Sequence, residues 1–127
     1  MSLQRFWWGF GILLVALAIL VCLVPGRELP HSLEWNDKLS HLAGHGALAL
    51  YFSGLVVRRN WWKLFVWLFA LGVAIEFAQV VLPTGREGDV RDVIANASGT
   101  GLGLLLGWMG LAHWPQWAAW LLGRRTA

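Results

Sequence analysis

The chain alternates between four long apolar runs and short polar segments. The runs fall at about residues 6–24, 39–57, 61–82 and 93–112. An α-helix needs about 20 apolar residues to cross a bilayer, and a backbone in hydrocarbon must satisfy its own hydrogen bonds. The pattern therefore predicts an all-α membrane protein, a four-transmembrane-helix bundle that forms a single domain over residues 1–127.

A shorter helix is predicted at residues 114–123. The segment "HWPQWAAWLLGRR" places Trp114, Trp117 and Trp120 near one helical face and ends in two arginines. A helix with aromatic residues on one face and basic residues at its end is typical of a segment that lies in the membrane interface. We therefore expect a short C-terminal interfacial amphipathic helix.

Composition and charge agree with a membrane protein and orient it. The chain is 57% hydrophobic and 13% charged, whereas a soluble domain is roughly 45–50% apolar and about 25% charged. Six Lys and Arg residues lie on the side of the two termini and four on the other side, so both termini are expected in the cytoplasm. The ten tryptophans have no basic groove beside them, which excludes nucleic acid as a partner.

Polar residues inside the apolar runs are the candidate functional residues, because an ionisable group within a spanning helix is costly. They are Asp37, His41 and His45 in the second run, Glu76 and Gln79 in the third, and Asp89, Asp92 and Asn96 at the start of the fourth. Their spacings of three or four residues place each set on one helical face. Counting inward at about 1.5 Å per residue places His45, Glu76 and Asn96 at one depth, and His41, Gln79 and Asp92 one turn above them. The sequence predicts one polar pocket, open to the outer face and floored by Glu76.

Three basic residues, Lys38, Arg86 and Arg91, are expected around the mouth of this pocket. Arg86 in particular suits a two-pronged grip on a phosphate or carboxylate. We expect an anionic lipid or a lipid-linked cell-envelope precursor as the partner, besides membrane lipids in general. The expected ligand-binding residues are Asp37, Lys38, His41, Glu76, Gln79, Arg86, Asp89, Asp92 and Asn96. No pattern sets an oligomeric state.

Chemistry at the pocket is the alternative to binding alone. Glu76, His41 and Asp92 are the candidate catalytic residues, because a buried carboxylate beside an imidazole can act as an acid–base pair on a lipid-linked substrate. His41 and His45 with Glu76 are weaker candidates for a metal site, since the two histidines are four residues apart. No His-Glu-x-x-His motif is present, and we expect no cofactor.

Two segments, "DKLSHLAGH" and "EFAQVVLPTGREGDVRDVIANASGTGLG", resemble the VanZ-like family of small bacterial integral membrane proteins. The residues that match its pattern are Asp37, Lys38, His41, Glu76, Gln79, Arg86, Asp89, Asp92, Asn96 and Gly99. The sequence departs from that pattern at His45, where an aromatic residue is more common, and at Thr84, which is an extra residue in the turn.

The resemblance implies a multi-pass protein of the bacterial cytoplasmic (inner) membrane. The family is named for a protein associated with resistance to the glycopeptide teicoplanin, which implies a link to the cell envelope and to antibiotic resistance. No agreed biochemical activity comes with the family name. The resemblance therefore supplies a location for the pocket and leaves binding and catalysis both open.

Overall fold

The computed structural model describes residues 1–24, 37–83, 85 and 88–123, and these residues are almost entirely helical. The α-helices are α1 (Leu3–Leu23), α3 (Asp37–Ser53), α4 (Trp61–Val81), α5 (Val90–Trp108) and α6 (Trp114–Leu121). Two 3₁₀ turns, Arg58–Asn60 and Leu111–His113, precede α4 and α6. The all-helical fold class is confirmed for the described part of the chain.

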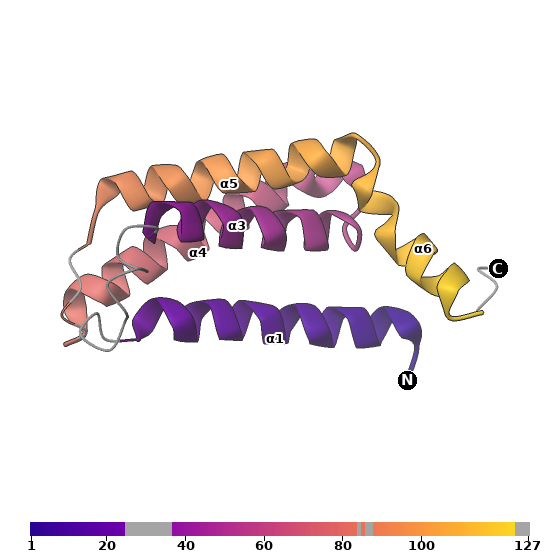
Figure 1. The fold of residues 1–127 in the computed structure, drawn as a ribbon, viewed down its shortest axis with the longest axis horizontal. Coiled ribbons are helices and arrows are strands. Elements are labelled where there is room, and N and C mark those ends of the chain that lie inside the picture. The colour runs from indigo at the N-terminus through magenta and orange to yellow at the C-terminus, as the bar shows by residue number, and fades with distance from the viewer. Residues whose placement is uncertain (25–36, 84, 86–87, 124–127) are drawn as a thin grey trace.

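The four long helices run alternately up and down, with α1 set slightly apart from the other three (Figure 1). The polar end of the bundle is the end where α3 and α5 begin and where α4 stops. The aromatic end is the opposite one, where Trp7, Tyr51 and Trp114 meet. The N-terminus and α6 both lie at the aromatic end (Figure 1).

Glycines allow α5 to lie directly on the backbone of α3. A side chain at Gly99 would collide with the carbonyl oxygen of Leu42, and one at Gly103 would collide with that of Gly46. Small residues at four-residue intervals permit this close approach between helices. The pairing also sets the register, so that α5 extends about one turn beyond the start of α3 at the polar end (Figure 1).

Four helix boundaries differ from the sequence expectation by three or four residues: the starts of α1 and α5 and the ends of α3 and α5. Two of these differences have a cause in the structure. α3 ends at Ser53 and not near residue 57, because the indole of Trp114 occupies the space beside Gly54 and donates to the carbonyl oxygen of Tyr51 at 3.0 Å. α5 begins at Val90 and not at residue 93, because Asp89 caps it by accepting from the backbone N–H of Arg91 at 2.8 Å.

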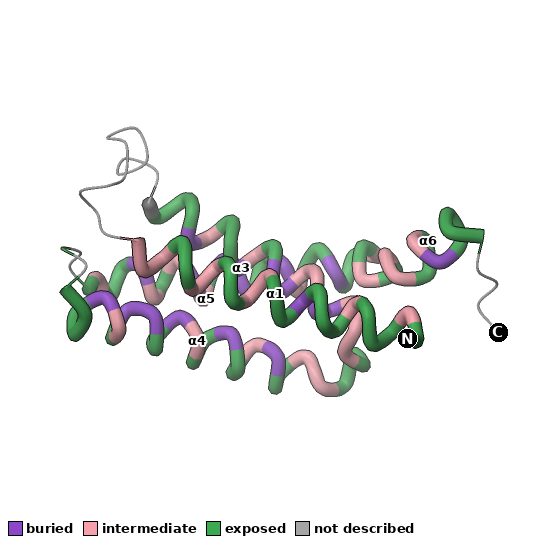
Figure 2. The backbone as a smooth tube through the Cα atoms, turned by 90° about the horizontal axis from the view of Figure 1, so that it is seen from below, coloured by how far each residue is buried: buried purple, intermediate pink, exposed green. Residues whose placement is uncertain are grey.

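The outward faces of α1 and α4 are apolar. Ile12 and Leu20 on α1 and Phe77 and Val80 on α4 are each more than 60% exposed, and of α1 only Gly11 is buried (Figure 2). Large exposed apolar surfaces of this kind are rare in soluble monomers. Residues 3–23 and 58–81 each have the length and composition to cross a membrane. The crossing of α3 and α5, which carry the polar residues, remains a prediction.

Hydrogen bonds fasten α1 to the bundle near both of its ends. The hydroxyl of Tyr51 donates to the carbonyl oxygen of Trp7 at 2.7 Å, at the aromatic end. The amide nitrogen of Gln79 donates to the carbonyl oxygen of Cys22, also at 2.7 Å, at the polar end. The middle of α1 is therefore held over α3 and α4 without a hydrogen bond from either that the structure records.

The predicted tail helix is present as α6, with Pro115 in its first turn, where a missing N–H costs nothing. Trp117 and Trp120 are exposed, whereas Trp114 turns inward and packs on Tyr51. The position of α6 at a membrane surface stays a prediction.

Candidate functional site

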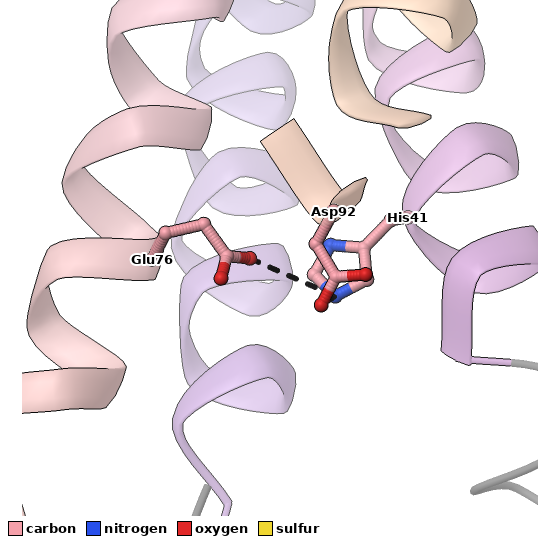
Figure 3. A group of neighbouring side chains, drawn as sticks. All are labelled: His41, Glu76 and Asp92. Atoms are coloured by element: carbon pink, nitrogen blue, oxygen red, sulfur yellow. Dashed lines mark ion pairs between the residues drawn. The ribbon is translucent and has the colours of Figure 1, made fainter. Parts of the chain in front are cut away.

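The imidazole of His41 lies at the centre of a buried polar cluster at the polar end. Its Nδ1 is 3.1 Å from Oδ1 of Asn96. Its Nε2 is 3.7 Å from Oδ2 of Asp92 and 4.0 Å from Oε1 of Glu76. Figure 3 shows the two carboxylates converging on the ring from α4 and α5. We refer to His41, Glu76, Asp92 and Asn96, none more than 7% exposed, as the His41 cluster.

Each carboxylate of the cluster uses its other oxygen on the rim. Oδ1 of Asp92 accepts from the Lys38 ammonium at 3.2 Å, and Oε2 of Glu76 accepts from the backbone N–H of Asp89 at 3.2 Å. Lys38 is shared, since it also donates to Oδ2 of Asp89 at 3.1 Å. One lysine thus serves two carboxylates, and the described cluster with its rim carries more acidic than basic groups.

Asp89, like Lys38, is exposed at this rim. The backbone N–H of Arg91 and the Lys38 ammonium, in that order, hold the pKa of its carboxyl below the usual value of 3.8. Both contacts favour the charged form. Asp89 is therefore ionised throughout the physiological range, both as the cap of α5 and as a partner of Lys38.

A cavity of about 570 Å³ adjoins the cluster beneath α1. Its lining includes the polar residues Ser40, His41, His45, Tyr51 and Asn96, and the rest of its wall is apolar. We refer to this cavity as the α1 groove. It is lined by Leu14, Leu17, Ala18, Val21, Cys22, Ser40, His41, Gly44, His45, Ala47, Leu48, Tyr51, Leu71, Ile75 and Asn96.

The groove opens sideways between α1 and α3. Ser40, Gly44 and Ala47 of α3 line it and are exposed, as are Leu17 and Val21 of α1. The α3 side of this opening consists of small residues, one turn apart. From Ser40 to Tyr51 the lining follows α3 for about 16 Å. A ligand entering from the side would meet an apolar channel with imidazole and amide groups toward its polar end.

The structure brings together some of the predicted site residues and separates others. His41, Glu76, Asp92 and Asn96 meet, and Lys38 and Asp89 form their rim. Gln79 reaches instead to α1, and Arg91 is exposed. The side chain of Asp37 and the whole of Arg86 lie outside the described residues. The binding roles of all these residues stay predictions.

His45 differs from its expected place. Depth counting put it level with Asn96, but His41 makes that contact, because α5 starts further out than α3 and the two helix ends are not level. His45 is 5% exposed and lines the groove, and among the described residues its Nδ1 has no hydrogen-bond partner. Asp92 takes its place among the groups with metal-ligand spacing: one atom each of His41, Glu76 and Asp92 lie within 4.8 Å of one another.

The groove itself was missed by sequence analysis. Its α1 wall carries no polar residue, so that wall is indistinguishable in sequence from a lipid-facing surface. The run of small residues at Gly44 and Ala47 in α3 is a signal that could have indicated it, because small side chains leave room beside a neighbouring helix.

Comparison with known proteins gives one family and one relative. A family model described as VanZ/LLP1 matches residues 19–112, which contain the whole His41 cluster. The chain is also 35% identical over 97 residues to the fluoride-specific ion channel FluC 1 of Symbiobacterium thermophilum. That alignment covers 70% of this chain and 77% of the relative. No solved structure matches the chain.

Proposed function

Because the chain belongs to the VanZ/LLP1 family and is a membrane protein, we propose that it binds an anionic lipid or lipid-linked cell-envelope precursor. The polar head would lie at the His41 cluster and the apolar chain in the α1 groove. The observation that carries this proposal is the cavity itself, in which an apolar wall leads to the imidazoles of His41 and His45 and the amide of Asn96. An amphiphile has the same division along its length.

The shape of the groove supports a ligand that comes from the bilayer. Its side opening lies between α1 and α3, and α1 presents apolar side chains to the surroundings. A volume of about 570 Å³ lies within the range of roughly 300–1,000 Å³ typical of small-molecule sites. Entry through the side spares the ligand a passage of its chain through water.

The orientation of the site follows from the distribution of basic residues. Lys and Arg are more frequent on the side of the two termini, which favours the cytoplasm for that side and the outer face for the polar end. In this orientation the His41 cluster faces the leaflet in which envelope precursors are consumed. A contribution to teicoplanin resistance would then come from holding such a precursor.

The proposal is tested by filling the groove. The variants Gly44→Leu and Ala47→Leu place a large side chain at its opening, where a side chain at Gly44 would meet no atom within 4 Å. Ala43→Leu is the matched control, since Ala43 is exposed on the same helix and does not line the cavity. Native mass spectrometry of each protein, extracted in mild detergent, measures the co-purifying lipid.

We expect a lipid adduct on the parent and on Ala43→Leu, and its loss by at least about tenfold from the two groove variants. The folded fraction is checked by circular dichroism. Equal lipid occupancy in all four proteins would contradict the proposal, and so would a parent that carries no lipid when extracted from membranes.

Fluoride passage is the second candidate, favoured by the similarity to a fluoride-specific channel. The acidic character of the cluster argues against it, because Glu76 and Asp92 both aim an oxygen at the same point, and carboxylates repel anions. Acid–base catalysis by His41 and Glu76 on the bound lipid is a third. Fluoride efflux from liposomes and turnover of the co-purified lipid distinguish these from binding alone.

A further inference from the structure

Hydrogen bonding determines what His41 presents to the two carboxylates. The amide oxygen of Asn96 can only accept, so the Nδ1 that faces it at 3.1 Å carries the proton. In the neutral ring Nε2 then carries a lone pair and no proton. It is directed at Oδ2 of Asp92 and Oε1 of Glu76. Three electron-rich atoms from three helices therefore converge on one point.

Their separations are informative. The two distances from Nε2, 3.7 and 4.0 Å, are longer than the roughly 2.7–3.2 Å of a direct hydrogen bond. Around a tetrahedral zinc ion with bonds of about 2.0–2.2 Å, neighbouring ligand atoms lie about 3.4 Å apart. The ligand atoms of the three residues all lie within 4.8 Å of one another, so a contraction of at most about 1.4 Å would bring them to the spacing of zinc ligands.

The remaining oxygens of the carboxylates are engaged in ways that orient the first two. Oδ1 of Asp92 is held by Lys38 and Oε2 of Glu76 by the N–H of Asp89. These contacts turn Oδ2 and Oε1 inward, and Asn96 holds the imidazole from behind. Outer contacts of this kind commonly fix the direction of metal ligands and the tautomer of a histidine.

We infer that Nε2 of His41, Oε1 of Glu76 and Oδ2 of Asp92 form a site for a divalent transition-metal cation. An imidazole with two carboxylates suits Zn²⁺ or Mn²⁺, whereas Mg²⁺ and Ca²⁺ take oxygen ligands. Three protein ligands leave one position of a tetrahedral ion for an external group, as in catalytic zinc sites.

A bound cation also balances the charge of the site. Two buried carboxylates near a lone pair repel one another, and Lys38 is shared between Asp92 and Asp89. A divalent ion offsets both carboxylates and gives an anionic headgroup something positive to bind. The inference stands on the geometry alone and does not require that the chain bind a lipid.

The test is zinc binding by the full chain in detergent, after removal of metals with a chelator and without added lipid. Titration calorimetry should show one Zn²⁺ per chain, held at least about tenfold more tightly than Mg²⁺. X-ray absorption should show a shell of nitrogen and oxygen ligands that includes one imidazole. Because no lipid is added, this result is independent of the lipid-binding experiment.

Variants then assign the ligands. His41→Gln, Glu76→Gln and Asp92→Asn should each weaken zinc binding by about 100-fold or more, and Asn96→Leu by about 10–100-fold. His113→Gln is the control, because His113 is an exposed histidine at the aromatic end. It should bind zinc as the parent does. Circular dichroism establishes that each variant is folded.

Two results would overturn the inference. One is a folded parent that shows no saturable zinc binding. The other is binding that survives in the three ligand variants or is lost in His113→Gln, which would place the ion elsewhere. If a ligand variant does not fold, the absorption spectrum of the parent decides, because a shell without imidazole excludes His41.

Discussion

The two ends of the bundle use polar groups in opposite ways. At the aromatic end the hydroxyl of Tyr51 and the indole N–H of Trp114 each donate to a backbone carbonyl oxygen, at 2.7 and 3.0 Å. All these groups are neutral. At the polar end, by contrast, two carboxylates and an imidazole converge at distances longer than hydrogen bonds. The aromatic end is thus held by direct hydrogen bonds between neutral groups, whereas the polar end also holds ionisable groups that face one another at longer distances.

This difference distinguishes polar groups that stabilise the fold from polar groups that we expect to bind a ligand. Neutral, directly bonded groups stabilise a fold and need no ligand, and the stacked rings of Tyr51 and Trp114, 4.8 Å apart, add packing. Buried like charges destabilise the protein unless a partner compensates them. We therefore expect changes at the aromatic end to lower stability and leave binding intact. Changes to the two carboxylates of the His41 cluster should weaken binding without lowering stability in the absence of metal.

The largest effect is expected from Trp114→Ala. This change removes the hydrogen bond to Tyr51 and ring packing against both Tyr51 and Trp7. Loss of a packed tryptophan costs about 3–5 kcal/mol, so the melting temperature in detergent should fall by roughly 10 °C or more. Zinc affinity, measured well below the melting temperature, should be unchanged.

Trp117→Ala is the control for this comparison, because Trp117 is 50% exposed on the same short helix. It should melt within a few degrees of the parent. Equal losses in the two variants would show that α6, and not the Trp114 contacts, matters for stability. A change in zinc affinity in Trp114→Ala would show that the two ends are coupled.

Glu76→Gln should change the free energy of unfolding by a smaller amount, and the sign of the change should depend on whether zinc is bound. In metal-free protein the change removes one of two converging negative charges and keeps an oxygen to accept from the N–H of Asp89. It should raise stability by about 1 kcal/mol. With saturating zinc the order should reverse, because the variant has lost a ligand. Thermal melts of the parent and the variant, with and without zinc, measure these stabilities. If Glu76→Gln is less stable than the parent in the absence of metal, the contrast between the two ends is wrong.

The smallest effect is expected at the exposed rim, from Asp89→Asn. The asparagine retains the helix cap and removes the negative charge that the N–H of Arg91 and the Lys38 ammonium stabilise. A lowered pKa means that this charge contributes stability above about pH 3.8, and that the contribution is lost as the pH falls through the pKa of the folded protein. The parent should therefore be slightly more stable than the variant at pH 6, and the difference should shrink as the pH falls below 3.8. A difference that is independent of pH would assign the effect to the cap.

Much of the fold follows from the sequence because the apolar runs encode helix length. The four predicted runs and the four long helices agree to within about four residues. Two of the differences have a cause in a single side chain: Trp114, from far along the chain, limits α3, and Asp89 caps the start of α5. Contacts of Trp114 with Tyr51 join residues 63 positions apart, and no local pattern predicts them.

The sequence predicts which residues form the site better than it predicts how they are arranged. Three- and four-residue spacing correctly places His41, Glu76, Asp92 and Asn96 on inward faces, since that depends only on the helical period. The vertical register depends on how α5 lies on α3, and this is set by Gly99 and Gly103 against backbone oxygens. Counting from the helix ends therefore paired Asn96 with His45, one turn too deep. The gap beneath α1 depends on how that helix is held, which its apolar sequence does not encode.

The way α1 is attached has a consequence for how such a protein can diversify. Both recorded hydrogen bonds to α1 end on main-chain oxygens, those of Trp7 and Cys22, and a main-chain oxygen is present whatever side chain the residue carries. Leu17 and Val21 line the groove from α1 and are each more than half exposed, so they can be exchanged without removing either hydrogen bond or the core contacts of the helix. Mutation can alter which apolar chain fits while the helix keeps its place, so ligand preference and attachment can evolve separately.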